Sequence, residues 1–416
     1  MNVPVSLFWR RVVTVLTGTI AAQALPLLLA PLITRMCTPQ EMGAFSVWLG
    51  VVQIVSIVAT LRLETAMILD HDSSDQQTCF SVIANFSLML AIVTTIGAVF
   101  ARQLGMSQAV QMNWFGLLTI GVGMWLTAYT HSILAYATSY NAFGKAAQAK
   151  VWGAGSIVLS QVLLLLLGAG SIGLMAGQII GLACGLIAAV FLLSPPRPQL
   201  SWTPSAAQRQ YLNKHAAFWR YALPADLLNV VAGKLPLFMI GLKFGLLEAG
   251  LFALTQRVLA APISLLAASV LEVFKRQSVH EWQTFGNCRD AYTHTFKALA
   301  LLGAIPTILM VLFAPHLFAL IFGESWRQAG EYARIMSPLY FLNFIASPLS
   351  YVFYVVGKQR VDLVWQVALF AMTATVFFSP LTLKQCLWWY TCGYSLLYLI
   401  YLALSYRFAH HKLNLA

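Results

Sequence analysis

The sequence has little charge. Only 9% of its 416 residues are Asp, Glu, Lys or Arg, whereas 59% are hydrophobic, and the mean hydropathy is +0.76. A soluble domain carries about 25% charged residues, because charged side chains cover its surface. This composition therefore excludes an ordinary soluble protein and predicts a polytopic membrane protein.

The sequence also lacks the patterns that hold metals, nucleotides or catalytic nucleophiles. Its six cysteines form no CxxC pair and show no metal-ligand spacing. No nucleotide-binding or nucleophile motif is present either. We therefore expect no cofactor and no metal, and we do not expect an enzyme.

Long apolar runs take up most of the chain. A helix needs about 20 apolar residues to cross a hydrocarbon core of about 30 Å. Twelve runs meet that length, and they predict an all-α fold: Val12–Thr34, Gly43–Leu61, Phe80–Ala101, Asn113–Thr138, Gln148–Gly168, Ile172–Leu193, Phe218–Gly241, Gly250–Leu271, Thr295–Phe318, Ile335–Val356, Leu363–Leu383 and Leu387–Tyr406.

The distribution of Lys and Arg predicts the orientation of these helices. With the N-terminus in the cytoplasm, 17 of the 25 Lys and Arg residues fall on the cytoplasmic side and six in outer loops. Short cytoplasmic loops retain such residues, so both termini are expected in the cytoplasm. The net charge of +12 then reflects topology and attraction to anionic lipid, and it is no argument for nucleic-acid binding.

A proline-rich and basic stretch divides the helices into two sets of six. We predict an N-terminal six-helix bundle over residues 1–193, a cytoplasmic linker over 194–217 and a C-terminal six-helix bundle over 218–416. A parallel repeat of this kind places a shared site between its halves.

Two cations lie well inside apolar segments. Lys234 precedes the end of one run at Gly241 by seven residues, and Arg257 follows the start of the next run at Gly250 by seven. If Leu242–Ala249 is a short loop, each cation lies about 10 Å below the same face. A charge at such depth usually faces a cavity or a partner. We expect an anion site, the alternative being that Lys234 extends to the interface and Arg257 forms a buried ion pair.

A short motif occurs once in each half. Glu41, Gly43 and Phe45 form E-x-G-x-F in the first outer loop, and the same pattern begins at Glu248, after the midpoint of the chain. Each copy follows the first helix of its half. The match indicates an internal duplication.

Five further charged or titratable residues are candidates for substrate binding or ion coupling. Arg62 is a third candidate cation for the substrate. Glu64, Asp226 and Glu272 lie near the inner ends of predicted helices and are candidate coupling sites. His131 is a candidate relay within the fourth helix. The alternatives are an interfacial polar cluster for Arg62 and Glu64, pairing of Asp226 with Arg220, and an interior hydrogen-bonded histidine.

Four short fragments of the chain carry a resemblance to a known family. They are Arg35 with Thr38–Phe45, Leu61–Ala66, Glu248–Phe252, and Phe322–Trp326 with Ala329 and Gly330. In this order and spacing they resemble the Wzx-type polysaccharide flippases of the multidrug/oligosaccharidyl-lipid/polysaccharide (MOP) exporter superfamily. The resemblance covers the whole chain, although Leu63 stands where that family usually has an aromatic residue.

The resemblance implies two six-helix bundles around a central cationic cavity. It also implies alternating access that moves a polyprenyl-diphosphate-linked oligosaccharide, such as an O-antigen repeat unit, across the bacterial inner membrane, with ion-driven turnover. The implied partners are this substrate, membrane lipid, a polysaccharide polymerase and a chain-length regulator. Lys234 and Arg257 would attract the diphosphate, and Arg257 can do so in bidentate geometry. Two other functions stay open: a multidrug-type exporter, and a membrane polysaccharide polymerase.

Overall fold

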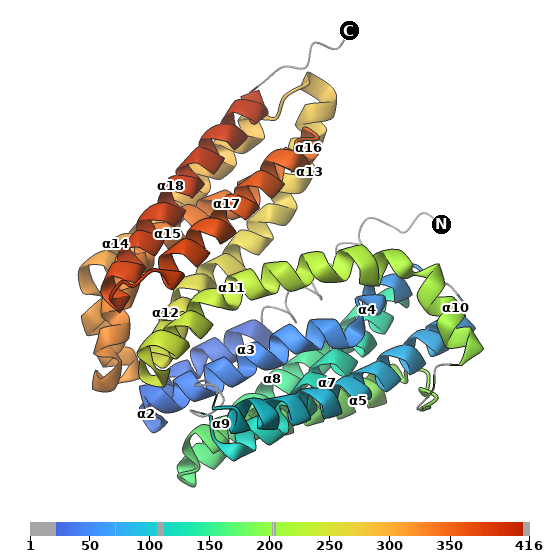
Figure 1. The fold of residues 1–416 in the computed structure, drawn as a ribbon. Coiled ribbons are helices and arrows are strands. Elements are labelled where there is room, and N and C mark those ends of the chain that lie inside the picture. The colour runs from blue at the N-terminus through green and yellow to red at the C-terminus, as the bar shows by residue number, and fades with distance from the viewer. Residues whose placement is uncertain (1–21, 71, 106–111, 202, 204, 411–416) are drawn as a thin grey trace. The chain divides into compact units, whose positions relative to one another are not determined.

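A computed structural model describes residues 22–70, 72–105, 112–201, 203 and 205–410 (Figure 1). Within these ranges the chain is helical and contains no β-strand. It separates into two compact units. The first comprises Met1–Lys234 and Gly245–Gly250, and the second comprises Leu235–Phe244 and Leu251–Ala416.

The first unit is a bundle in which α8 packs along α9, and α7 packs against α3, α5 and α9. Its helices are α2 (Ala30–Met36), α3 (Pro39–Thr60), α4 (Leu63–Met67), α5 (Ser73–Gln103), α7 (Trp114–Ser139), α8 (Phe143–Leu166), α9 (Gly170–Leu193), α10 (Ala206–Lys214), the π-helix η1 (Phe218–Ala222) and the first part of α11 (Leu223–Phe244).

The second unit is a bundle in which α15 packs against α14 and α18, and α17 packs against α18. It contains the end of α11, α12 (Leu246–Pro262, from Leu251), the π-helix η2 (Ile263–Ala267), α13 (Ala268–Phe285), α14 (Arg289–Phe322), the 3-10 turn η3 (Glu324–Trp326), α15 (Arg327–Leu349), α16 (Val352–Val355), α17 (Gln359–Phe378) and α18 (Leu383–His410).

Eleven helical stretches in the described part of the chain are long and apolar enough to cross a membrane. Each matches one predicted span, and the predicted all-α membrane fold is confirmed. Residues 12–21 of the first predicted span lie outside the described residues. Its remainder is helical from residue 22 to Met36 except at Leu29, which forms a turn.

The turn between α11 and α12 is shorter than predicted. The expected loop Leu242–Ala249 is wrong, because α11 continues to Phe244 and α12 begins at Leu246. Gly245 alone makes the turn, with a φ of 94° that favours glycine. Lys243, whose charge suggested a loop, donates to the carbonyls of Phe377 and Ser379 at 3.0 and 2.6 Å.

The two E-x-G-x-F motifs pack against each other in the first unit. A methyl group on Gly43 would lie 1.8 Å from the carbonyl oxygen of Leu246, and one on Gly250 would lie 1.8 Å from that of Pro39. In each pair the carbonyl belongs to the residue four positions before the other glycine. The contact is therefore reciprocal. Glu41 has a separate role: its carboxylate accepts from the backbone N–H of Thr38 at 2.8 Å and caps α3.

Candidate functional site

The break between α3 and α4 is built from two residues in the left-handed region. Leu61 and Arg62 have φ values of 52° and 58°, which non-glycine residues seldom adopt. The backbone N–H of Leu61 donates to the carbonyl of Val58 at 3.1 Å, and that of Arg62 donates to the Thr60 hydroxyl at 3.3 Å. Backbone strain of this kind occurs often at functional sites, which makes this break a candidate site.

Arg62 lies between two carboxylates in the first unit. Its Nη1 is 3.1 Å from Oε1 of Glu64, and its Nε is 2.5 Å from Oδ2 of Asp226, in the first turn of α11. The structure thus brings together three of the predicted site residues from distant parts of the chain.

The cluster carries more negative than positive charge, since one guanidinium faces two carboxylates. Glu64 is buried, with a side chain only 12% exposed, and its Oε2 has no hydrogen-bond partner. A buried carboxylate oxygen of this kind can accept a proton or a cation. In this arrangement the two carboxylates compensate the positive charge of Arg62.

His131 lies on α7, close enough to this cluster for the charges of Glu64 and Arg62 to act on it. The helix α7 packs against α4, which carries Glu64. The predicted relay histidine is therefore a neighbour of the predicted coupling carboxylate.

Lys234 and Arg257 both lie within membrane-length helices and are partly exposed. Both also interact with neighbouring groups. Lys234 precedes the end of α11 by ten residues, and Arg257 follows the start of α12 by eleven, which places them roughly 17 and 18 Å from Gly245 along their helices. The depth is greater than the predicted 10 Å because the turn is shorter. Lys234 ends the first unit and Arg257 belongs to the second.

Glu272 lies on α13 in the second unit, where its carboxylate accepts from Lys275 Nζ at 2.9 Å. Its side chain is 59% exposed. Exposed pairs one helical turn apart contribute little to stability. Its local surroundings differ from those of buried Glu64, which it follows by 208 residues, half the length of the chain.

The predicted linker contains a helix that the sequence reading missed. Buried Asp70 accepts from the Tyr211 hydroxyl at 2.6 Å and from Lys214 Nζ at 3.3 Å, and its carboxylate lies 3.2 Å from His215 Nε2. A hydrogen bond from Lys214 to Asp75 raises the pKa of Lys214 above its usual value. These contacts fasten α10 to the first bundle. The signal that predicts this helix is the capping box of Ser205 and Gln208.

A buried carboxylate in the second unit is also fully engaged. Asp362 accepts from the Tyr401 hydroxyl at 2.5 Å, from Gln366 Nε2 at 2.9 Å and from the Tyr354 hydroxyl at 3.5 Å. These donors come from α16, α17 and α18. Asp362 therefore joins three helices of this bundle. Among the described residues no group of three side chains is arranged to hold a metal ion.

The fold is that of the MOP superfamily of membrane transporters. An inward-facing structure of a multidrug resistance MATE family transporter of that superfamily superposes with a TM-score of 0.69 at 16% identity, covering 95% of this chain and 96% of the other. A MOP superfamily transporter from Pyrococcus furiosus, described as having a binding pocket of reverse polarity, gives 0.61 at 15% identity, with 96% and 95% covered.

Residues 32–331 match the family described as polysaccharide biosynthesis protein, and the chain belongs to that family. The chain is also 24% identical over 336 residues to the succinoglycan biosynthesis transport protein ExoT of Rhizobium meliloti, with 75% of this chain aligned. It spans 61% of the length of that relative. The relatives named here are transporters. The expected link to polysaccharide biosynthesis is confirmed by the family match, and the expected MOP-type fold by the superposed structures.

Proposed function

We propose that this protein is a flippase for a polyprenyl-diphosphate-linked oligosaccharide, a repeat unit of O-antigen or a related surface polysaccharide. The match to the polysaccharide biosynthesis family carries the proposal. The chain shares its fold with MOP transporters, which supports transport by alternating access. One of its relatives is a transport protein of succinoglycan biosynthesis, which supports the class of substrate.

The proposed substrate site uses Lys234 and Arg257. Both cations lie deep within membrane-length helices, where ionisable residues mark functional sites. A diphosphate or an acidic sugar carries the opposite charge and would bind them in addition to their neighbours within the protein. Arg62, held between Glu64 and Asp226, contributes to substrate binding only if one of those carboxylates is protonated or moves away.

The proposed coupling site is the cluster of Glu64, Asp226 and Arg62, with His131 beside it and Glu272 as the corresponding carboxylate of the second half. Protonation of Glu64 would remove one of the two negative charges that hold Arg62 and leave its ion pair with Asp226. That change links binding of a proton or another cation to a rearrangement at the left-handed break after α3. Glu64→Gln is therefore expected to abolish gradient-driven accumulation while substrate binding remains.

We further place the protein in the bacterial inner membrane with both termini in the cytoplasm, and we retain the division at residues 193 and 218 as the proposed boundary of its two halves. A polysaccharide polymerase and a chain-length regulator are the proposed partners, because they act on the product of the flippase.

The test of this function measures surface polysaccharide per molecule of protein. Loss of one ionic contact costs about 1.5–3 kcal/mol, or roughly ten- to a hundredfold in affinity. Lys234→Gln and Arg257→Gln are therefore expected to lower export, and Arg257→Lys to restore part of it because an ammonium lacks the planar fork. Wild-type export per molecule in both Gln variants would exclude these residues from the site.

A multidrug-type exporter is the alternative that the MATE structures favour. Cationic drugs would require acidic groups at the substrate site, whereas Lys234 and Arg257 are basic. Counterflow of a cationic drug, with no response to a lipid-linked saccharide, would support this alternative.

A further inference from the structure

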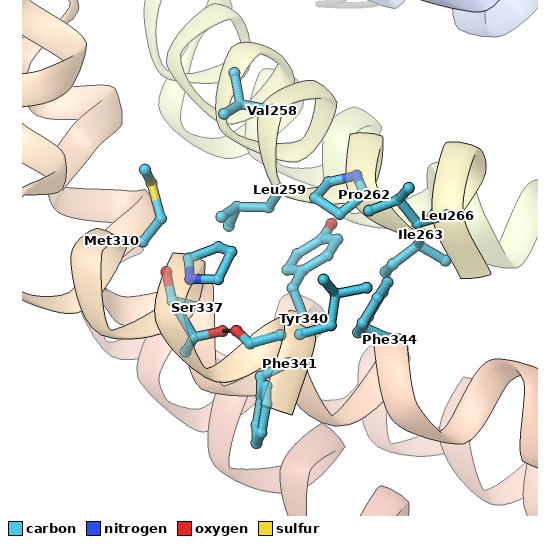
Figure 2. Close-up of a pocket in the computed structure, with 14 residues that line it drawn as sticks. Val258, Leu259, Pro262, Ile263, Leu266, Met310, Ser337, Tyr340, Phe341 and Phe344 are labelled. Carbon is cyan, nitrogen blue, oxygen red and sulfur yellow. Dashed lines mark hydrogen bonds between the residues drawn. The ribbon is translucent and has the colours of Figure 1, made fainter. Parts of the chain in front are cut away.

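An apolar pocket lies within the second unit, between α12 with η2 on one side and α14 with α15 on the other (Figure 2). Its volume is about 230 Å³. Tyr340 lies at its centre, with Leu259 and Pro262 on one side of the ring and Phe341 and Phe344 on the other. Apolar cavities of about 150 Å³ bind molecules of the size of benzene, so this one holds roughly ten carbon atoms of a single hydrocarbon chain.

The pocket offers almost no polar contact to a ligand. The hydroxyl of Thr307 donates to the carbonyl of Gly303 at 2.8 Å, and that of Ser337 donates to the carbonyl of Ala333 at 2.6 Å. Tyr340 interacts with the side chain of Gln256. A sugar would lose its hydrogen bonds to water and gain few in the pocket, whereas a hydrocarbon chain has no hydrogen bonds to lose.

The pocket is accessible from a lipid-facing helix. Only 17% of the most apolar part of α14 is buried, and Leu301, Ile305 and Ile308 expose 73%, 64% and 56% of their surface. Leu302 and Leu266 line the pocket and are themselves about half exposed, at 50% and 47%. A hydrocarbon chain can therefore reach the pocket from the membrane.

A cation lies beyond one end of the pocket. Arg334 precedes the pocket residue Ser337 by three positions, on the same face of α15, and its Nη2 donates to the carbonyl of Leu312 on α14 at 3.5 Å. Its Nη1 lies 3.4 Å from Glu331. Both distances are at the limit for a hydrogen bond. The buried Nε of Arg334 has no hydrogen-bond partner, and the side chain is 40% exposed, so its Nη groups are accessible to an anion.

Arg334 and the pocket are arranged like the head and tail of one lipid. Arg334 lies seven residues into α15, about 10 Å from the start of that helix, and the pocket residues Ser337 to Phe344 lie about 15–26 Å from it. In the proposed topology this end of α15 is the outer end. An anionic head at Arg334 with its tail in the pocket has the orientation of a lipid in the outer leaflet.

We propose that this pocket, together with Arg334, binds the isoprenoid diphosphate part of the substrate after it has crossed the membrane. The proposal rests on the proposed function for the identity of the lipid. The pocket has room for part of one hydrocarbon chain, which favours an isoprenoid over a phospholipid, because the second chain of a phospholipid would remain outside the pocket. Pro262 and Pro306, with Phe341 and Phe344, form a wall of stiff side chains that suits a methyl-branched chain.

The experiment uses the full chain in lipid nanodiscs with a photoreactive geranylgeranyl diphosphate as the probe. We expect crosslinks on α14 and α15. Thr307→Trp fills the pocket and should reduce labelling at least tenfold, whereas Ile308→Trp, the same substitution on the exposed face of α14, should not. Arg334→Gln should weaken the apparent affinity about tenfold. Arg327→Gln, which removes another cation of α15, is its matched control.

Labelling that survives both Thr307→Trp and Arg334→Gln would overturn the proposal, as would equal competition by phosphatidylglycerol, which would indicate a general lipid site. A melting temperature for each variant distinguishes loss of binding from loss of folding, and Thr307→Phe replaces a Trp variant that does not fold. Specific labelling of a protein that moves no lipid-linked saccharide would refute the proposed function and leave the isoprenoid site intact.

Discussion

Alanine at Gly43 or Gly250 should destabilise the protein through the contact between the two motifs. A Cβ atom at either position would lie 1.8 Å from a backbone oxygen, whereas real Cβ contacts are essentially never closer than 3.0 Å. The helices α3 and α12 must therefore separate by about 1.2 Å, since neither obstacle is a flexible side chain. Overpacking costs about 1–3 kcal/mol, and replacing glycine by alanine in a helix returns up to about 1 kcal/mol. The upper part of this range applies, which leaves a net loss of about 2 kcal/mol.

The assay is thermal unfolding of the full chain in detergent, with Gly233→Ala as the control. Gly233 is also helical, and no atom lies within 4 Å of its added methyl, so this variant should melt at or above the wild-type temperature. Both Gly43→Ala and Gly250→Ala should melt several degrees lower. The double variant should lose less than the sum, because one substitution already parts the helices. Equal melting of Gly43→Ala and Gly233→Ala, or strict additivity, would refute this reasoning.

The remaining predictions concern the attachment of α10, the buried thiol of Cys288 and the membrane topology. Tyr211→Phe removes a buried hydrogen bond to Asp70 and should make the segment around α10 more sensitive to limited proteolysis. Arg209→Gln, on the exposed side of α10, should not. Equal cleavage rates in the two variants would contradict the attachment of α10 through Asp70. Burial raises the pKa of the Cys288 thiol to about 12, so maleimide should not label it between pH 7 and 9, and fast labelling of the folded protein would refute its burial. Because the same thiol ionises near pH 9 in the unfolded chain, its contribution to stability should fall as the pH rises above 9. Single cysteines that replace the exposed residues Arg209 and Arg289 should be labelled from the cytoplasmic side, and those that replace Gln40 and Gln328 from the outer side. Labelling of a cysteine at position 289 from the outer side would contradict the proposed topology.

The sequence predicts the membrane-spanning helices because apolar length is itself the physical requirement for crossing a bilayer. It predicts their ends less well. The helix α14 begins at Arg289, six residues before the predicted Thr295, because a helix can continue past the hydrocarbon core into polar sequence. The charges of Lys243 and Glu248 indicated a loop, whereas Gly245 alone reverses the chain.

The candidate site was predictable only in part. Glu64, Arg62 and Asp226 were each identifiable as charges near helix ends, but their meeting depends on the fold, and the sequence gives no sign that Arg62 bridges both carboxylates. The partners of Asp70 are equally remote in sequence, since Tyr211 and Lys214 follow it by more than a hundred residues. By contrast, the capping box that begins α10 is local, and a local signal of this kind can be read from sequence.

Translocation of a polyprenyl-diphosphate-linked oligosaccharide in vesicles that contain only this protein is the most direct test of the proposed function. With the substrate placed in one leaflet and its sugar made accessible to a lectin or a glycosidase from the other side, the wild-type protein should move it, and Lys234→Gln or Arg257→Gln should slow the movement roughly ten- to a hundredfold. No movement by folded wild-type protein under either a proton or a sodium gradient, or equal rates in the wild type and both variants, would contradict the account.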